Sequence, residues 1–419
     1  MKMNKLTVAI LIAMLLGIFT GQGYRLFAPA QAATFASDIT ILTDIFLRLI
    51  KMIIAPLVFT TLVVGIAKMG DTRTVGRIGA KTLGWFMLAS LMSLTLGLVM
   101  VHLMQPGVGL SLSLPDDGAS SGVAATAISL KDFVTHAIPK SVIEAMATNE
   151  ILQIVVFSLF FGLAAAALGD AAKPVVMLMA SAAEIMLKVT GYVMNFAPFA
   201  VFGAIAAMVA KEGLGILATY GTFMAQFYLA LACLWLLLIA MGSLFIRRRI
   251  LTLLAMIREP ILLAFSTASS EAAYPKTLDR LEKFGCDKRI ASFVLPMGYS
   301  FNLDGSMMYC TFAVMFIAQA YGIELSMAQQ ITMLLLLMVT SKGMAGVPRA
   351  SLVVIAATLN QFQIPEAGIL LLLGIDHFLD MGRSATNVLG NAIAASVVAK
   401  TEDSLGETAP LGETDLAKV

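Results

Sequence analysis

Long apolar stretches recur along the whole chain, and several reach about 20 residues, enough for an α-helix to cross the hydrocarbon core of a bilayer. Water is absent there, so backbone N–H and C=O groups must bond within the protein, as they do in a helix. The composition agrees, because 59% of the 419 residues are hydrophobic and only 13% are charged. The sequence therefore predicts an all-α integral membrane protein.

Apolar runs before residue 250 predict the first helices of the bundle. Their expected ranges are about 6–27, 38–69, 82–104, 151–168, 172–209 with an interruption at Pro198, and 216–246. The segment between the second and third helices carries Arg73, Arg77 and Lys81, whereas residues 105–130 contain no Lys or Arg. An excess of bases marks cytoplasmic segments, so we expect both termini and the arginine triplet at 247–249 to lie inside.

Beyond residue 250, two segments are apolar at both ends but polar and small in the middle. They are 251–281, centred on 266–273, and 331–359, centred on 340–348. Each half is too short to span a bilayer, and non-helical backbone at membrane depth is tolerated only where it lines a cavity. Two re-entrant helical hairpins are therefore expected, the first opening from inside and the second from outside. Such a pair is typical of inverted-repeat transporters with a substrate site at the midplane.

The apolar segment between the two hairpins, about 289–321, is itself interrupted at 298–306. Asn302, Asp304 and the carbonyl groups freed by Gly298 and Gly305 could hold a hard cation or a proton at this break. The alternative is a simple glycine kink in which Asn302 and Asp304 cap the helix ends.

The last long apolar segment carries a stripe of polar side chains, at 376, 380, 383, 387 and 391. Steps of three and four residues place them on one face of a helix. Ionisable groups at membrane depth persist only in a protein interior or a watery cavity, so this face lines a site. Arg383 presents a planar fork that suits a carboxylate, and Asp380 can take a cation. Arg383 could instead merely neutralise Asp376 or Asp380, but a ligand with both a carboxylate and an ammonium would use the whole stripe.

Four motifs, in order, resemble the dicarboxylate/amino acid:cation symporter family, which includes bacterial glutamate and aspartate symporters. They are the serine-rich 266–275, the Asn-Leu-Asp-Gly-Ser of 302–306, the Ala-Gly-Val-Pro of 345–348, and Asp-Met-Gly-Arg at 380–383 with Asn387. The resemblance covers essentially the whole chain. It implies eight transmembrane helices with two re-entrant hairpins, assembled as a homotrimer in the bacterial cytoplasmic (inner) membrane.

The resemblance also implies a division of labour along the chain. Residues 1–249 would form mainly the scaffold, with the third and sixth helices moving with the transport core of residues 250–400, which carries substrate by an elevator motion. Residues 401–419 are polar and are expected to be a disordered cytoplasmic tail.

Carried over residue by residue, the resemblance assigns a substrate site. Arg383 would bind the side-chain carboxylate of an acidic amino acid and Asp380 its ammonium, while Asp376 would orient Arg383. Asn387 and two hairpin serines, Ser269 and Ser270, would hold the α-carboxylate region. The remaining expected substrate contacts are Ser306, Gly346, Val347 and Ser384. Relatives that carry C4-dicarboxylates lack an acid at the position of Asp380, so glutamate and aspartate are the favoured substrates.

Departures from the family pattern concern the coupling ion. Sodium-coupled members have an aspartate in place of Asn391, and a tyrosine and a threonine in place of Phe86 and Ala89. Lys342 and Met344 stand where those members have an uncharged residue and a threonine. Each change removes an oxygen ligand or a negative charge, or adds a positive charge, so all three sodium sites look degraded.

A proton carrier is the expected replacement for sodium. Glu271 adds a carboxyl group at the tip of the first hairpin, and burial there would raise its proton affinity. It is the first candidate and Asp304 the second, with Lys342 standing in for a lost cation or pairing with Glu271. Gly298, Asn302 and Asn391 complete the expected coupling site.

Other functional classes fit less well. Sodium coupling and C4-dicarboxylate transport on the same fold remain the alternatives. An anion channel would need rows of pore-lining charge, and a hydrolase would need more than Ser341 beside Lys342 on a loop. No enzyme activity, cofactor or nucleic-acid partner is expected, because the three cysteines lack metal-ligand spacing and no basic patch is interleaved with aromatic residues. Membrane lipids and a small acidic substrate are the expected partners.

Overall fold

The structure is a computed structural model of the chain and describes residues 5–69, 72–108, 138–213, 220–341, 350–373 and 375–408. Within these ranges the regular secondary structure is helical, and an isolated β-bridge joins Cys286 to Leu405. Six stretches in the same ranges are long and apolar enough to cross a membrane: Val8–Phe27, Arg73–Met104, Leu152–Val193, Gly221–Ile246, Arg249–Thr267 and Lys288–Ala320. The prediction of an all-α, multi-pass membrane protein is therefore supported.

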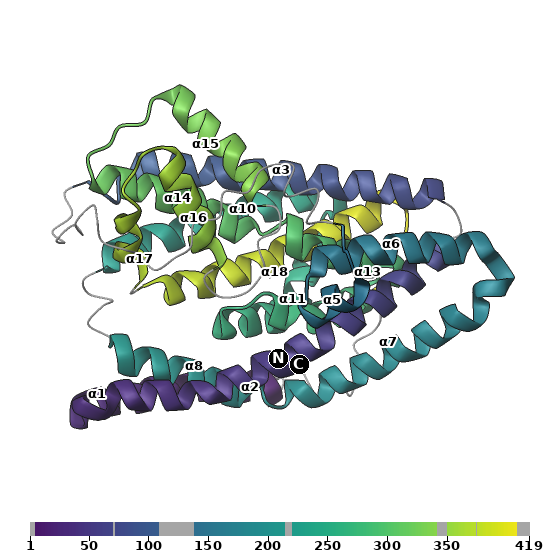
Figure 1. Cartoon of the computed structure of the whole chain (residues 1–419), viewed down its shortest axis with the longest axis horizontal. Helices are drawn as coiled ribbons and strands as arrows, with labels where there is room; N and C mark the ends of the chain where they lie inside the picture. The colour runs from purple at the N-terminus through teal and green to yellow at the C-terminus, as the bar shows by residue number, and fades with distance from the viewer. Residues whose placement is uncertain are drawn as a thin grey trace.

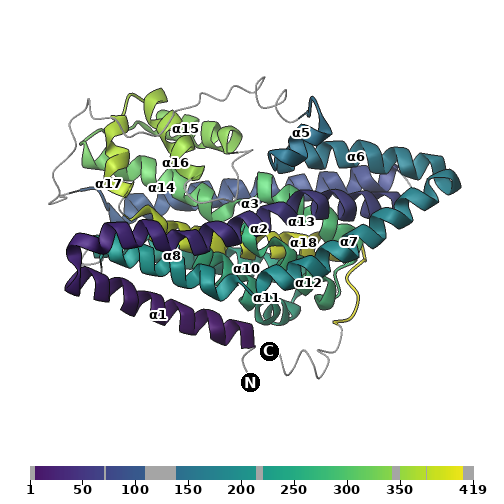
Figure 2. The same cartoon turned by 60° about the horizontal axis from the view of Figure 1, so that its bottom comes forward.

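Of the first three helices, the first two lie side by side along one edge of the molecule (Figures 1 and 2), and the third runs along the opposite edge in Figure 1. They are α1 (Lys5–Phe27), α2 (Pro29–Met69) and α3 (Thr72–Met104). Helices α1 and α2 both pack against α8 (Ala197–Glu212). The first helix agrees with its predicted range, but α2 and α3 begin earlier than expected. Residues 73–81, interpreted as part of a loop, instead form the first turns of α3, since the segment contains no proline and its two glycines, Gly76 and Gly79, are tolerated within the helix.

The middle of the chain forms α5 (Val142–Ala147), α6 (Ile151–Leu168), η1 (Gly169–Ala172), α7 (Lys173–Met194), α8 and α10 (Gly221–Ile246). The range predicted for the fourth helix is that of α6. The interruption expected at Pro198 is present between α7 and α8, and Pro198 is the second residue of α8. Proline is accepted in the first turn, where its missing N–H would have had no partner in the helix.

Helices α11 (Arg249–Thr267) and α12 (Tyr274–Phe284) form a hairpin joined by a short turn that includes η2 (Glu271–Ala273). A buried ion pair holds the two arms together, with Arg280 Nη2 2.7 Å from Glu259 Oε2 and Lys276 Nζ 3.3 Å from the other oxygen of that carboxylate. The second broken segment forms α15 (Met327–Thr340) and α16 (Ala350–Gln361), which also pack together. Of its predicted centre, 340–348, residues 342–348 lie outside the described residues.

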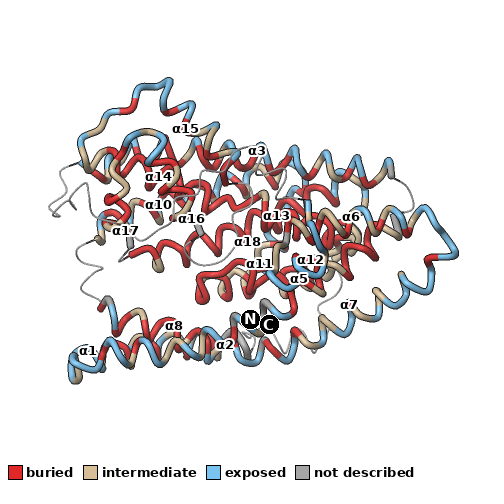
Figure 3. The backbone as a smooth tube through the Cα atoms, viewed as in Figure 1, coloured by how far each residue is buried: buried red, intermediate tan, exposed pale blue. Residues whose placement is uncertain are grey.

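The predicted interruption in the seventh helix separates α13 (Lys288–Phe301) from α14 (Asp304–Ala320). After η3 (Glu366–Ile369) and α17 (Leu370–Leu373), helix α18 (Asp376–Thr401) runs through the interior and packs against α10, α11, α13 and α14. Figure 3 shows α18 buried along nearly its whole length, whereas α7 exposes much of its surface. The polar stripe of α18 is therefore enclosed by protein, and so is its opposite face.

The chain after α18 departs from the predicted disorder. The backbone N–H of Asp287 donates to Ser404 O at 3.1 Å, and the N–H of Gly406 donates to Gly285 O at 2.9 Å. Residues 402–408 thus run against the turn between α12 and α13, and their polar composition concealed these backbone hydrogen bonds. Residues 409–419 lie outside the described ranges.

Candidate functional site

The five polar side chains of α18 are all buried, with exposed fractions between 0% and 5%. Four of them contact residues 302–309 at and after the break between α13 and α14, and Asp380 pairs with Arg383. Burying this much polarity is costly unless each group finds a partner. The partners, from Asp376 at one end of the stripe to Asn391 at the other, define the candidate site.

Arg383 is completely buried. Its Nη2 atom lies 3.1 Å from Asp376 Oδ1 and 3.0 Å from Asp380 Oδ1, so one nitrogen serves both carboxylates. The guanidinium also stacks on the ring of Tyr309 at 4.0 Å, and the Tyr309 hydroxyl donates to Asp376 Oδ1 at 3.1 Å. The guanidinium plane is thereby fixed from one side.

Two nitrogen atoms of the Arg383 guanidinium have no protein partner in the part of the chain that the structure describes. Both Nε and Nη1 are buried there without a hydrogen bond. Buried donors are nearly always satisfied, so each exception calls for an explanation. Each of these nitrogens forms a two-donor edge only together with Nη2, which the two aspartates already contact. A carboxylate can therefore take one hydrogen bond from Nε or Nη1, and a second, parallel one from Nη2 once an aspartate releases it. The arrangement can therefore accept a carboxylate ligand.

Asn387 joins α18 to the first turn of α14. Its Oδ1 accepts from the backbone N–H of Gly305 at 2.9 Å and of Ser306 at 3.3 Å, and its Nδ2 donates to Ser306 Oγ at 3.1 Å. Gly305 permits this approach, because a Cβ there would lie 2.6 Å from the carbonyl oxygen of Arg383. Asn387, predicted to contact substrate, thus also supports the helix end beside the site.

Asp304 lies at the start of α14 in a polar cluster with Asn302 and Asn391. Its Oδ1 accepts from Ser93 Oγ at 3.2 Å, and its Oδ2 accepts from Asn302 Nδ2 at 3.0 Å. Asn302 Nδ2 also lies 3.2 Å from Asn391 Oδ1. Asp304 and Asn391 are completely buried. Three of the residues expected at the coupling site are therefore in direct contact.

Glycines make this cluster compact. The Asp304 carboxylate occupies the space that a Cβ of Gly390 would need, and the Asn391 amide does the same at Gly298. Gly298, predicted at the coupling site, thus lies beside Asn391. Asn302 Oδ1 and Asn391 Nδ2 are buried and have no hydrogen-bond partner among the described residues. The cluster can therefore still accept one hydrogen bond and donate another.

The tip of the first hairpin places its predicted residues in the interior. Ser269, Ser270 and Glu271 are 2%, 0% and 7% exposed. Ser269 Oγ accepts from the backbone N–H of Ala272 at 3.4 Å, whereas Ser270 Oγ has no hydrogen-bond partner within the described ranges. Ser384 is buried on α18 next to Arg383. Lys342, Met344, Gly346 and Val347 lie outside the described residues.

Comparison with known proteins identifies the family. Residues 6–401 match the sodium:dicarboxylate symporter family, which is almost the whole chain. The chain belongs to this family. As expected from the sequence motifs, the buried polar stripe, the broken helix and the serine-rich hairpin tip therefore belong to a transporter and not to an enzyme.

Several curated members of the sodium:dicarboxylate symporter family are similar over most of their length. The proton/sodium-glutamate symport protein of Bacillus caldotenax is 41% identical over 404 residues, covering 95% of this chain and 94% of the relative. The C4-dicarboxylate transport protein of Laribacter hongkongensis is 40% identical over 403 residues, covering 94% and 89%. The proton/glutamate-aspartate symporter of Bacillus subtilis is 40% identical over 362 residues, covering 86% and 87%.

Two residues of this symporter's site were missed by sequence reasoning. Ser93 lies one helical turn after Ala89 on α3, so the spacing from Phe86 and Ala89 could have indicated it. Tyr309 offered no such signal, because an aromatic residue in an apolar helix usually packs in the core. Only the approach of α14 to α18 reveals its contact with Arg383.

Proposed function

We propose that the chain is a secondary symporter that imports glutamate and aspartate together with protons. The observation that carries the proposal is the buried Arg383 guanidinium, which has two N–H groups without a hydrogen bond in the described structure and lies 3.0 Å from Asp380. A substrate carboxylate would accept a hydrogen bond from one of these N–H groups and a second from Nη2. Asp380 would then exchange its contact with Arg383 for the substrate ammonium, which keeps the local charge balanced.

Asp380 decides between the two substrate classes named among the relatives. A C4-dicarboxylate has no ammonium, and its second carboxylate would be repelled by an acidic side chain in the site. An acidic amino acid offers the cation that Asp380 needs once Arg383 turns to the substrate. The presence of Asp380 therefore favours glutamate and aspartate over succinate or malate.

Proton coupling is favoured by the composition of the cluster around Asp304. Asn391 contributes a neutral amide, and Phe86 and Ala89 on α3 contribute no side-chain oxygen, so Asp304 is the single carboxylate in the contacts described here. Hard cations such as Na⁺ prefer several oxygen ligands that include negative charge. Glu271, buried at the hairpin tip, is the first candidate for the proton carrier, and Asp304 is the second.

The proposed transport cycle uses the two helical hairpins as gates. The α11–α12 hairpin would re-enter from the cytoplasmic side and the α15–α16 hairpin from the outside, with eight further helices spanning the membrane. The core of residues 250–400, together with α3 and α10, would move as an elevator against the rest of residues 1–249, in a homotrimer in the bacterial cytoplasmic membrane, with both termini inside. This arrangement is supported by the paired hairpins and by the family to which the chain belongs.

Uptake into proteoliposomes tests the proposal directly. Labelled aspartate and glutamate are offered under an inward proton gradient without sodium, or under a sodium gradient at equal pH on both sides. Accumulation driven by protons alone is expected, with unlabelled succinate a poor competitor. Uptake that strictly requires sodium would contradict the proposal of proton coupling. Effective competition by succinate would contradict the proposal that acidic amino acids are the substrates.

A further inference from the structure

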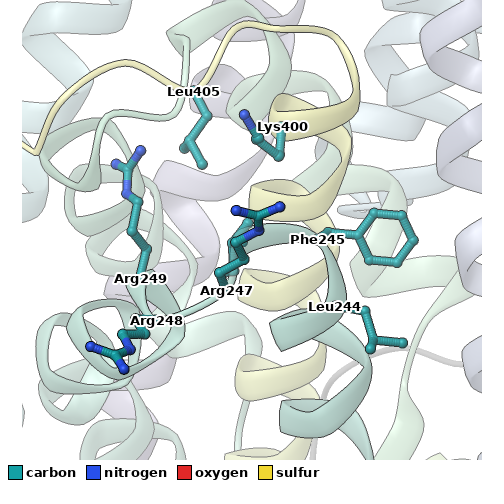
Figure 4. Close-up of a pocket in the computed structure, with 8 residues that line it drawn as sticks. Leu244, Phe245, Arg247, Arg248, Arg249, Lys400 and Leu405 are labelled. Carbon is teal, nitrogen blue, oxygen red and sulfur yellow. The ribbon is translucent and has the colours of Figure 1, made fainter.

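A basic cavity lies at the opposite end of α10 and α18 from the hairpin α15–α16 (Figures 1 and 4). Its volume is about 980 Å³, and it is formed by the end of α10, the start of α11, the end of α18 and Leu405. Four of its lining residues are cationic, namely Arg247, Arg248, Arg249 and Lys400, and none is acidic. The transport site described above does not use this cavity.

Three of the four cations have no protein partner. In the described part of the chain, the side chains of Arg247, Arg248 and Lys400 make no hydrogen bond and no ion pair. Arg249 differs, because its Nη2 donates to Phe284 O and to Gly406 O, both at 2.8 Å. Figure 4 shows the charged ends of Arg247, Arg249 and Lys400 around Leu405, with Arg248 turned away. Positive charge is thus concentrated in the cavity, and no carboxylate among the described residues lines it.

The local backbone makes this concentration less favourable still. Helix α11 starts at Arg249 with no side-chain cap and no acid in its first turn. The N-terminus of a helix carries partial positive charge and disfavours cations. Arg247 has φ 51° and ψ −134°, a backbone conformation that residues other than glycine rarely adopt and that often marks a functional position. An anion bound in the cavity would offset both costs.

The surroundings of the cavity favour a lipid over a soluble anion. Leu244 and Phe245, which also line it, lie in the last turn of the apolar helix α10 and are 78% and 41% exposed. Exposed apolar side chains directly beside arginines match a phospholipid, which presents acyl chains and a charged headgroup together. We propose that this cavity binds an anionic phospholipid, with its phosphate among Arg247, Arg249 and Lys400 and its acyl chains along Leu244 and Phe245.

A bound lipid would join three elements of the molecule. Arg247 ends α10, Arg249 begins the first hairpin, and Lys400 lies in the last turn of α18. One phosphate shared among them would restrain how these helices move relative to one another. The lipid would therefore stabilise the protein, independently of which substrate is carried.

Lipid titration of the purified full-length protein tests this site. Tm in a mild detergent is measured while phosphatidylglycerol or phosphatidylcholine is added. Phosphatidylglycerol should raise the Tm of the wild type, and Arg247→Gln/Lys400→Gln should weaken its apparent affinity by about thirtyfold, because each cation near a headgroup contributes about fivefold. The matched control Arg73→Gln/Lys173→Gln removes two exposed cations outside the cavity and should titrate as the wild type does.

Lys400→Gln alone provides a second variant if the double variant does not fold, and about a fivefold weakening is expected. Wild-type affinity in the cavity variants would overturn the proposal, as would equal stabilisation by phosphatidylcholine. Equal stabilisation by inorganic phosphate would indicate a soluble anion and would also contradict a lipid site.

Discussion

Asn387 and Ser306 are joined by two hydrogen bonds, one in each direction. Asn387 Oδ1 accepts from the Ser306 backbone N–H at 3.3 Å, and Asn387 Nδ2 donates to Ser306 Oγ at 3.1 Å. Together with the bond from Gly305, they tie the first turn of α14 to α18 directly beside Arg383. The Asn387 amide thus fixes the position of α14, which carries Tyr309, relative to Arg383 on α18.

Replacing Asn387 should separate its structural role from its role in binding. Asn387→Leu leaves two buried backbone donors without an acceptor, at about 1–3 kcal/mol each, so a lower Tm and loss of binding are expected. Asn387→Asp keeps an acceptor for both backbone N–H groups but buries a negative charge, so Tm should fall less than in Asn387→Leu while aspartate binding weakens. Thermal unfolding and isothermal titration of the same samples distinguish the two effects. Unchanged aspartate affinity in Asn387→Asp would argue against a substrate contact.

Asp380→Asn should change substrate preference. Loss of the charged partner for the ammonium should weaken the binding of glutamate and aspartate by about 10- to 100-fold, the range for a hydrogen bond to a charged group. The affinity for succinate should be unchanged or higher. Competition against labelled aspartate in proteoliposomes gives this ratio. Asp376→Asn is the matched control, because it also removes one charge next to Arg383 but should weaken both classes of substrate alike. An unchanged ratio in Asp380→Asn would contradict the ammonium role.

Glu271→Gln should uncouple transport from protons. The amide cannot carry a proton through the cycle, so uptake driven by an acid outside should fall to the level of vesicles without a gradient. Exchange of internal for external aspartate should continue, because it needs no net proton movement. The control Glu282→Gln, on the same hairpin but far from its tip, should keep driven uptake. Persistent proton-driven uptake in Glu271→Gln would leave Asp304 as the carrier.

Gly390→Ala should disrupt the Asp304 cluster. The added methyl group would occupy the position of the Asp304 carboxylate, which is buried and held by Ser93 and Asn302. Overpacking of this kind costs about 1–3 kcal/mol, so a clear drop in Tm is expected together with slower uptake. Gly84→Ala adds the same group on α3, where no atom lies within 4 Å, and should leave Tm unchanged or slightly higher. Equal Tm values for the two variants would contradict the packing described here.

Glu402 should make stability depend on pH at the end of α18. The hydrogen bond from Arg77, supported by Lys81, holds the pKa of Glu402 below its ordinary value of 4.5. Because the folded pKa is the lower one, the stabilisation is complete above the ordinary value and is lost as pH falls through the folded pKa. Tm of the wild type should exceed that of Glu402→Gln at neutral pH, and the difference should vanish in acid. Glu407→Gln, an exposed neighbour, should show no such difference.

The sequence alone determined the membrane-spanning helices, the two broken segments and the polar stripe of α18. These depend on local properties, since a run of apolar residues must be helical in a bilayer and charges at spacings of three and four must share a face. It also identified Arg383 and Asp380 as candidate substrate-binding residues and Asp304 as a candidate cation- or proton-binding residue. The roles assigned to the hairpin serines, Glu271, Lys342, Gly346 and Val347 stay predictions.

Only the tertiary structure decided how those residues meet. No local rule indicates that Arg383 would stack on Tyr309, that Asn387 would cap α14, or that Ser93 would reach Asp304, because each contact joins segments distant in the sequence. The order of residues 402–408 likewise comes from backbone hydrogen bonds to the turn after α12, which composition cannot reveal. The basic cavity around Arg247 and Lys400 arises in the same way. Its cations lie on different helices, and only the packing of the helix ends brings them close together.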